Sequence, residues 1–268
     1  MVFLVLLSLL FVSALGSLLN RHENVFPNWK TLSVKYAFYR SLPISENTAI
    51  ISSWKLLANS CEAESQFIGK RYAFNNDLAT VLIFDLNGIL AGIQMGISEH
   101  IKEAKWFGKI HIKDVDTNYV TAYFTEPSDI CNNIKIRNKD YVGDKLGILS
   151  GKELLDMPLK EAALKTTKWT KGKCVFGRGQ HYWYNVKSDM DCSDFFPIFL
   201  LYNNKLLTGF GFVACGILNN TNVEHHNSEK LKYLLEPITH PKCIDECADI
   251  LSTQYVYLNE NPGLNSFC

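Results

Sequence analysis

The chain has 268 residues, of which 27 are basic, 27 are acidic and 47% are hydrophobic. This length and hydrophobic content suit one large globular domain or two small ones. A net charge of zero without basic runs argues against nucleic acid or an anionic membrane as the main partner.

The N-terminus is typical of a secretory leader. Residues 2–15 are almost wholly apolar, and Ala14 and Gly16 are small residues at the spacing of a cleavage site. The basic residues that usually precede such a run are missing, so an uncleaved anchor is the alternative. The run ends at Leu19, however, and is short for a hydrocarbon core of ~30 Å. We therefore expect a signal peptide at residues 1–16, an extracellular mature protein and no transmembrane segment in it.

The first half contains a helix-like segment followed by hairpins. Pro43 opens the helix-like segment, in which Ile50, Trp54 and Leu57 recur at helical spacing. Two apolar runs then flank Asn87-Gly88, a dipeptide that tolerates positive φ and predicts a hairpin. Residues 109–116 and 118–127 are typical of two further strands.

The second half repeats this order of features. Matching positions follow in sequence: Pro43 and Pro158, Trp54 and Trp169, Cys61 and Cys174, Asn87 and Asn204, Tyr123 and Tyr233, and Cys131 and Cys243. We interpret the series as a tandem duplication; the alternative is two unrelated segments that share common turn chemistry.

The predicted fold class is therefore α+β, with two copies of a helix packed on an antiparallel, hairpin-rich sheet, stapled by disulfides. The first unit is expected at residues 17–150 and the second, which is richer in cysteine, at residues 151–268.

The cysteines favour disulfides, because the secretory route is oxidising. They are Cys61, Cys131, Cys174, Cys192, Cys215, Cys243, Cys247 and Cys268. If the units are homologous, Cys61–Cys131 and Cys174–Cys243 are equivalent bridges, and the other four cysteines pair among themselves. Spacing alone leaves the connectivity open, and Cys243 and Cys247 could exchange partners.

Residues 177–185 are the best candidate site. Two glycines flank Arg178, and polar aromatic side chains follow on a predicted strand, where alternate residues face opposite sides. The predicted ligand-binding residues are Arg178, His181, Tyr182, Trp183 and Tyr184, since aromatic rings with polar tips suit sugars, small aromatic molecules or a protein surface. The alternative is a structural strand with Trp183 in the core and the tyrosines at its rim.

An enzymatic interpretation is the runner-up. His181 could act as a general base, oriented by a nearby aspartate such as Asp191, while Arg178 holds an anion or oxyanion. No nucleophile motif accompanies these residues, so a hydrolase is less favoured than a non-enzymatic protein. The sequence predicts no metal site and no cofactor.

The motif Asn219-Asn220-Thr221 is an N-glycosylation sequon in a polar segment. Together these features favour a secreted, disulfide-bonded glycoprotein that binds a small molecule, a glycan or an extracellular protein through its second unit. Venom or another secretion, extracellular matrix and body fluid are all compatible settings.

Overall fold

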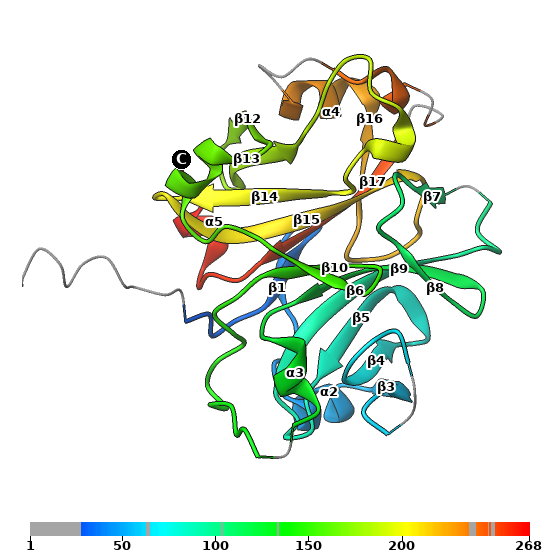
Figure 1. Cartoon of the computed structure of the whole chain (residues 1–268), viewed down its shortest axis with the longest axis vertical. Coiled ribbons are helices and arrows are strands. Elements are labelled where there is room, and N and C mark those ends of the chain that lie inside the picture. Colours follow the sequence, from blue (N-terminus) through cyan, green and yellow to red (C-terminus); the bar gives the residue numbers. More distant parts are fainter. Residues whose placement is uncertain are drawn as a thin grey trace, which may run out of the picture.

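The computed structural model describes residues 28–62, 65–102, 104–132, 134–235, 240–245, 247 and 250–268. The expected signal peptide lies outside these residues. In the described part, two antiparallel sheets lie one above the other in the view of Figure 1. No described helix has the length and hydropathy needed to cross a bilayer.

The first sheet has the strand order β11-β10-β9-β6-β5-β4-β3, with β8 also paired to β9. Its strands are β3 (Trp54–Asn59), β4 (Lys70–Phe74), β5 (Asp77–Phe84), β6 (Leu90–Ser98), β8 (Ile112–Asp114), β9 (Thr117–Tyr123), β10 (Gly147–Ser150) and β11 (Glu153–Asp156). The hairpin β10–β11 is therefore the edge of a sheet formed otherwise by the N-terminal half of the chain.

The second sheet has the order β12-β13-β14-β15-β17-β1-β2, with β16 paired to β17 and β7 paired to β15. Its strands are β1 (Ser33–Lys35), β2 (Tyr39–Ser41), β7 (Ala104–Trp106), β12 (Trp169–Val175), β13 (Gly179–Tyr184), β14 (Ile198–Asn203), β15 (Leu206–Gly216), β16 (Glu224–Asn227) and β17 (Ile250–Tyr257). Here the N-terminal hairpin β1–β2 forms the edge, so each sheet takes one hairpin from outside its own half of the chain.

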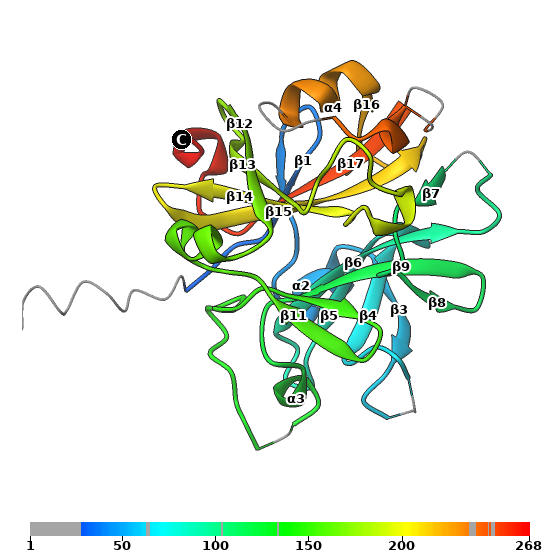
Figure 2. The same ribbon diagram turned by 45° about the horizontal axis from the view of Figure 1, so that its top comes forward.

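The predicted α+β fold class is wrong, because strands dominate both halves. The described helices are short: α2 (Glu46–Ile51), α3 (Pro127–Ile130), α4 (Ser228–Leu235), α5 (Pro262–Asn265) and the 3-10 helices η1 (Glu161–Thr166), η2 (Cys192–Asp194) and η3 (Lys242–Ile244). Helix α4 packs on β12 at the top of the molecule in Figure 2, and among the residues that the structure describes no helical layer covers the first sheet.

The expected helix after Pro43 ends early for a local reason. Ser45 caps it as expected, but Ser53 has a φ of 67°, which lies outside the helical region. The following residues pair with β4 as strand β3, and Trp54 lies opposite Phe74. Sheet pairing thus overrides the helical spacing of the apolar residues, because local propensity is only a weak preference.

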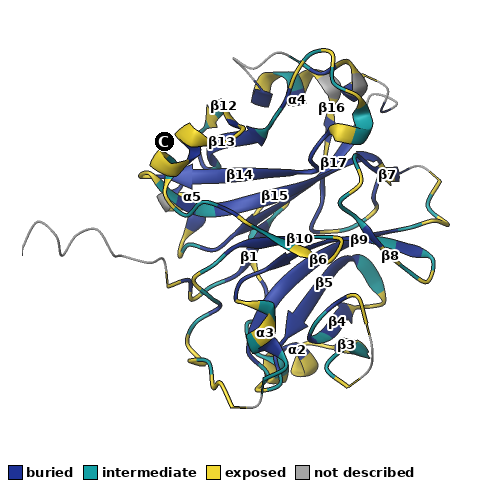
Figure 3. Cartoon of the chain, viewed as in Figure 1, coloured by how far each residue is buried: buried dark blue, intermediate teal, exposed yellow. Residues whose placement is uncertain are grey.

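The space between the sheets is filled by one apolar cluster to which both contribute. The rings of Phe124 from the first half and Phe210 from the second lie 6.3 Å apart within it. A polar contact also crosses the interface, where Gln254 Nε2 donates to Thr80 Oγ1 at 2.6 Å. Figure 3 shows buried strands in both sheets, with exposed residues on the loops and short helices. The sheets therefore share a common core.

The two halves run through the same succession of strand pairings. Corresponding pairs are Trp54 with Phe74 and Trp169 with Tyr184, and Gly92 with Tyr123 and Gly209 with Tyr257. The counterpart of Tyr123 is therefore Tyr257, whereas Tyr233 lies in helix α4. The tandem duplication stays a prediction, as does the division at residue 150, which falls beside the turn of the β10–β11 hairpin.

The protein is disulfide-bonded, with three bridges between described cysteines. Cys61–Cys131 is confirmed, with a Cα–Cα distance of 5.3 Å. The expected Cys174–Cys243 bridge is wrong, because Cys174 is bonded to Cys268. The third bridge joins Cys215 to Cys247. The expected bridge to Cys243 followed from matching Tyr123 with Tyr233. Because Tyr257 is the structural counterpart of Tyr123, the cysteine that corresponds to Cys131 is Cys268.

Candidate functional site

The aromatic strand β13 separates the predicted site residues onto two faces. His181 and Trp183 face the layer beneath helix α4, where both are fully buried. Tyr182 and Tyr184 face the opposite side, next to the core between the sheets. The alternation of a strand therefore prevents these side chains from forming a single site.

His181 is a neutral core residue. Its Nδ1 lies 3.1 Å from the Lys173 carbonyl oxygen, which can only accept, so Nδ1 carries the proton and Nε2 accepts from the Tyr255 hydroxyl at 3.3 Å. Burial lowers the pKa of His181 to about 3. Asp191, the aspartate expected to orient His181, instead accepts a hydrogen bond from the Ser193 backbone N–H at 2.7 Å. This environment does not support a general base open to substrate.

Arg178 lies on the same buried face. Its guanidinium is 4.3 Å from the centre of the Tyr255 ring, and Nη2 forms an ion pair with Glu224 at 2.8 Å. Nη1 is buried without a hydrogen-bond partner among the described residues. The contacts tie β13 to β16 and β17, which is a structural role.

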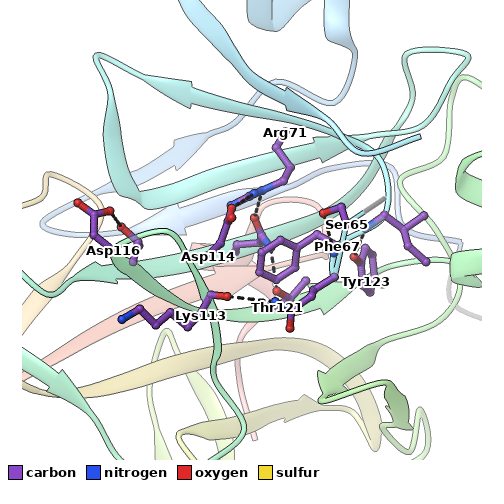
Figure 4. A network of polar contacts seen from close by, with 12 residues as sticks. Ser65, Phe67, Arg71, Lys113, Asp114, Asp116, Thr121 and Tyr123 are labelled. Atoms are coloured by element: carbon purple, nitrogen blue, oxygen red, sulfur yellow. Dashed lines mark hydrogen bonds and ion pairs between the residues drawn. The ribbon is translucent and has the colours of Figure 1, made fainter. Parts of the chain in front are cut away.

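The first sheet carries a comparable arginine cluster on its outer face (Figure 4). Arg71 Nε donates to Gln94 at 2.8 Å, and Nη1 pairs with Asp114 at 2.6 Å. The guanidinium also lies over the rings of Phe67 and Tyr119, at 4.4 and 4.5 Å. Partners on every side leave little capacity for a ligand, so this cluster too is structural.

Tyr182 lines a hollow of about 530 Å³ that we call the lysine pocket. Its walls are Glu161, Ala162, Leu164, Lys165, Trp169, Lys171, Tyr182 and Lys205. The Tyr182 hydroxyl donates to Glu161 Oε1 at 2.5 Å, and Lys171 Nζ is 3.9 Å from the same oxygen. Burial, followed by the Glu161 carboxylate, raises the pKa of Tyr182 above its ordinary value, so the phenol keeps its proton.

Tyr184 lines a second hollow of about 480 Å³, the apolar pocket. Its walls are Ile110, Leu155, Asp156, Met157, Pro158, Thr167, Lys168, Trp169, Tyr184 and Phe196. The Trp169 ring meets Tyr184 and Phe196 edge to face, at 5.3 and 5.8 Å between centroids. Trp169 thus belongs to both pockets and is held by aromatic packing.

The corresponding place in the first half carries a smaller hollow of about 360 Å³ beside Trp54 and Phe74. The first half also has the tyrosine–glutamate contact, because the Tyr72 hydroxyl donates to Glu46 at 2.6 Å, although neither residue lines this hollow. That contact is therefore shared by both halves, and in the first half Lys70 also forms an ion pair with Glu46, but no described lysine lines the hollow beside Trp54.

Of the predicted ligand-binding residues, only Tyr182 and Tyr184 line these pockets. Trp169 and Lys205 were not among the predicted site residues, and Trp169 was singled out only as the match of Trp54. The pairing of Trp169 with Tyr184 depends on the sheet, so no local pattern indicates it. Asn219 is exposed in the loop after β15, and its glycosylation stays a prediction.

No protein-family model, curated protein or solved structure matches this chain.

Proposed function

We propose that this protein is a secreted, non-enzymatic binding protein whose ligand is a small amphipathic anion held against Trp169. The observation that carries the proposal is the placement of Trp169 between a hollow lined by lysines and a hollow lined by apolar side chains. The ligand's apolar body would occupy the apolar pocket, and its acidic group would lie in the lysine pocket.

The apolar pocket has the size and chemistry for the body of such a ligand. Small-molecule sites are typically concave, largely apolar and roughly 300–1,000 Å³ in volume. Leu155, Met157 and Phe196 form its walls with the fixed ring of Trp169. A preformed wall loses little conformational entropy when a ligand binds.

The lysine pocket supplies the charge. Glu161 is engaged by Tyr182 and faces Lys171, while Lys165 and Lys205 form no ion pair with a described residue. The pocket therefore has an excess of positive charge beside an indole ring, which favours a carboxylate, sulfate or phosphate group over a cation.

The extracellular setting rests on the disulfides and the apolar N-terminus. Bridges such as Cys61–Cys131 persist in oxidising compartments. The neutral, buried state of His181 supports a binding role over a hydrolytic one.

The test uses the full disulfide-bonded protein and two fluorescent probes with related aromatic skeletons, anilinonaphthalene sulfonate and the uncharged N-phenylnaphthylamine. We expect both to bind and to quench or shift tryptophan emission. Lys205→Glu should weaken the sulfonate about tenfold, which is ~1.4 kcal/mol, and leave the uncharged probe unchanged.

The control is Lys55→Glu, a charge reversal at an exposed position next to Trp54. It should alter neither affinity. The proposal fails if the folded protein binds neither probe, or if Lys55→Glu and Lys205→Glu have equal effects on the sulfonate.

A further inference from the structure

A third hollow, of about 520 Å³, lies between the β1–β2 hairpin and the turn after β17. We call it the hydroxyl pocket. Its walls are Thr31, Ser33, Tyr39, Ser41, Asn259, Glu260, Asn261, Pro262, Gly263 and Leu264. No lysine or arginine lines it, so its chemistry differs from that of the lysine pocket.

Several polar atoms of this pocket are buried without a hydrogen-bond partner in the described part of the chain. They are Thr31 Oγ1, Ser33 Oγ, and both Oδ1 and Nδ2 of Asn259. Ser33 is only 5% exposed. Leaving buried donors and acceptors unpaired is unfavourable, so such a concentration in one cavity wall points to a ligand that pairs with them.

The pocket also has a fixed aromatic wall. The Tyr39 hydroxyl donates to the Gly177 carbonyl oxygen, and its ring meets the Tyr257 ring edge to face at 5.2 Å. Gly263 lies close against the other part of the Tyr39 ring, where a built Cβ would be 2.9 Å from Cε2. The ring is therefore fixed beside the unpaired amide and hydroxyls, with Lys35 Nζ 4.8 Å from its centre.

The corresponding place at the edge of the first sheet is closed by ion pairs. The pairing of Ser33 with Tyr257 and Ser41 corresponds to that of Gly147 with Tyr123 and Asp156.

By this register Thr31 corresponds to Lys145, Ser41 to Asp156 and Glu260 to Glu126. Lys145 Nζ forms ion pairs with both Glu126 and Asp156, the latter at 3.0 Å. At the edge of the second sheet a hydroxyl, Thr31, stands in place of the lysine and another, Ser41, in place of the aspartate, so this arrangement of charges is not repeated there.

We propose that the hydroxyl pocket binds a neutral carbohydrate, with one hexose unit held by Asn259, Ser33 and Thr31 against the Tyr39 ring. A carboxamide and hydroxyls provide both donors and acceptors, which the neighbouring hydroxyls of a sugar require. The apolar face of the sugar ring packs on Tyr39, as amphipathic aromatic side chains allow. The absence of lysine and arginine from the pocket wall favours a neutral sugar over a sulfated or sialylated one.

The test is saturation-transfer NMR on the full protein with methyl glucoside, methyl galactoside, methyl mannoside and N-acetylglucosamine, followed by an array of glycoprotein-type glycans. We expect transfer to at least one neutral hexoside. Signal from the free hexosides as well as the array indicates a terminal-sugar site, and signal from the array alone indicates that a longer neutral glycan is needed; both support the proposal.

Two variants separate ligand binding from folding. Asn259→Leu removes unpaired polar atoms, so it should abolish saturation transfer without lowering the melting temperature. The double variant Thr31→Lys, Ser41→Asp introduces the charges of Lys145 and Asp156 from the edge of the first sheet and should likewise abolish the signal. Trp169→Phe should leave it unchanged, which distinguishes this site from the one proposed above.

The proposal is overturned if no neutral saccharide or glycan gives a signal with the folded wild-type protein. It is also overturned if the signal survives both Asn259→Leu and the double variant. A marked loss of melting temperature in Asn259→Leu would show that the amide serves the fold, and would equally contradict it.

Discussion

Trp29 and Gly143 form an antiparallel bridge at corresponding places in the two halves of the chain. Trp29 N–H donates to the Gly143 carbonyl at 3.0 Å, and the Val142 N–H donates back to the Trp29 carbonyl at 2.7 Å. Ser33 follows Trp29 at the spacing at which Gly147 follows Gly143. The segments that lead into hairpins β1–β2 and β10–β11 thus meet before each hairpin joins a different sheet.

The exchanged hairpins lead to a prediction about the disulfides. Cys61–Cys131 and Cys174–Cys268 each join the edge region of a sheet to the short helix after its β9 or β17 strand. Replacing either pair by serine should lower the free energy of unfolding by about 4 kcal/mol, because each closes a long loop in the unfolded chain. Urea unfolding measures the loss. Peptide mapping without reduction should recover Cys174 joined to Cys268; recovery of Cys174 joined to Cys243 would contradict the structure.

His181 predicts a loss of stability in acid. Its folded pKa of about 3 lies below the ordinary value of 6.5, so the unfolded chain binds the proton more readily. The contribution of neutral His181 to the free energy of unfolding is complete above pH 6.5 and is lost as the pH falls toward 3. Over this range the free energy of unfolding changes by up to ~1.4 kcal/mol per pH unit because of His181. Unfolding at a series of pH values should show a shallower acid slope for His181→Gln than for the wild type. The exposed His100→Gln serves as control, and equal slopes for all three proteins would argue against a buried neutral His181.

The contacts of Arg71 predict that lysine cannot replace this arginine without a loss of stability. Arg71→Lys should lower the free energy of unfolding by about 2 kcal/mol, because a lysine cannot stack on two rings and also reach Gln94 and Asp114. The same change at exposed Arg40 should cost less than about 0.5 kcal/mol. Chemical denaturation compares the two variants, and a similar small cost for both would show that the cluster in Figure 4 contributes little to stability.

The tyrosine–glutamate contacts predict that removing the tyrosine hydroxyl lowers stability by a similar amount in each half of the chain. Tyr72→Phe and Tyr182→Phe each remove a hydroxyl that donates to a carboxylate, Glu46 or Glu161. Each should cost about 1.5–3 kcal/mol of unfolding free energy, as expected for a hydrogen bond to a charged group. Only Tyr182→Phe should also change the affinity for anilinonaphthalene sulfonate. If Tyr72→Phe changes that affinity equally, the lysine pocket is not the binding site.

Local features that depend only on residues adjacent in the sequence could be predicted from the sequence. Asn87-Gly88 lies in the turn of the expected hairpin between β5 and β6, where Gly88 has a φ of 74° and Asn87 is not among the residues with positive φ. In the second hairpin both Asn204 and Lys205 have positive φ. The serine cap at residue 45 was also correct. Each of these outcomes follows from the backbone preferences of a few adjacent residues, which the sequence states directly.

The tertiary structure alone decided which distant segments meet. Trp169 belongs to a strand because β13 pairs with it. Cys174 bonds to Cys268 because the segment after helix α5 returns to the end of β12, where the Gly177 N–H donates to the Ser266 carbonyl at 3.1 Å. The hydroxyl pocket likewise joins Ser33 to Asn259 from opposite ends of the chain. By itself the sequence determined the local turns, the cap and a chain suited to disulfides. Strand partners and cavity walls depend on long-range packing, which short-range patterns do not encode.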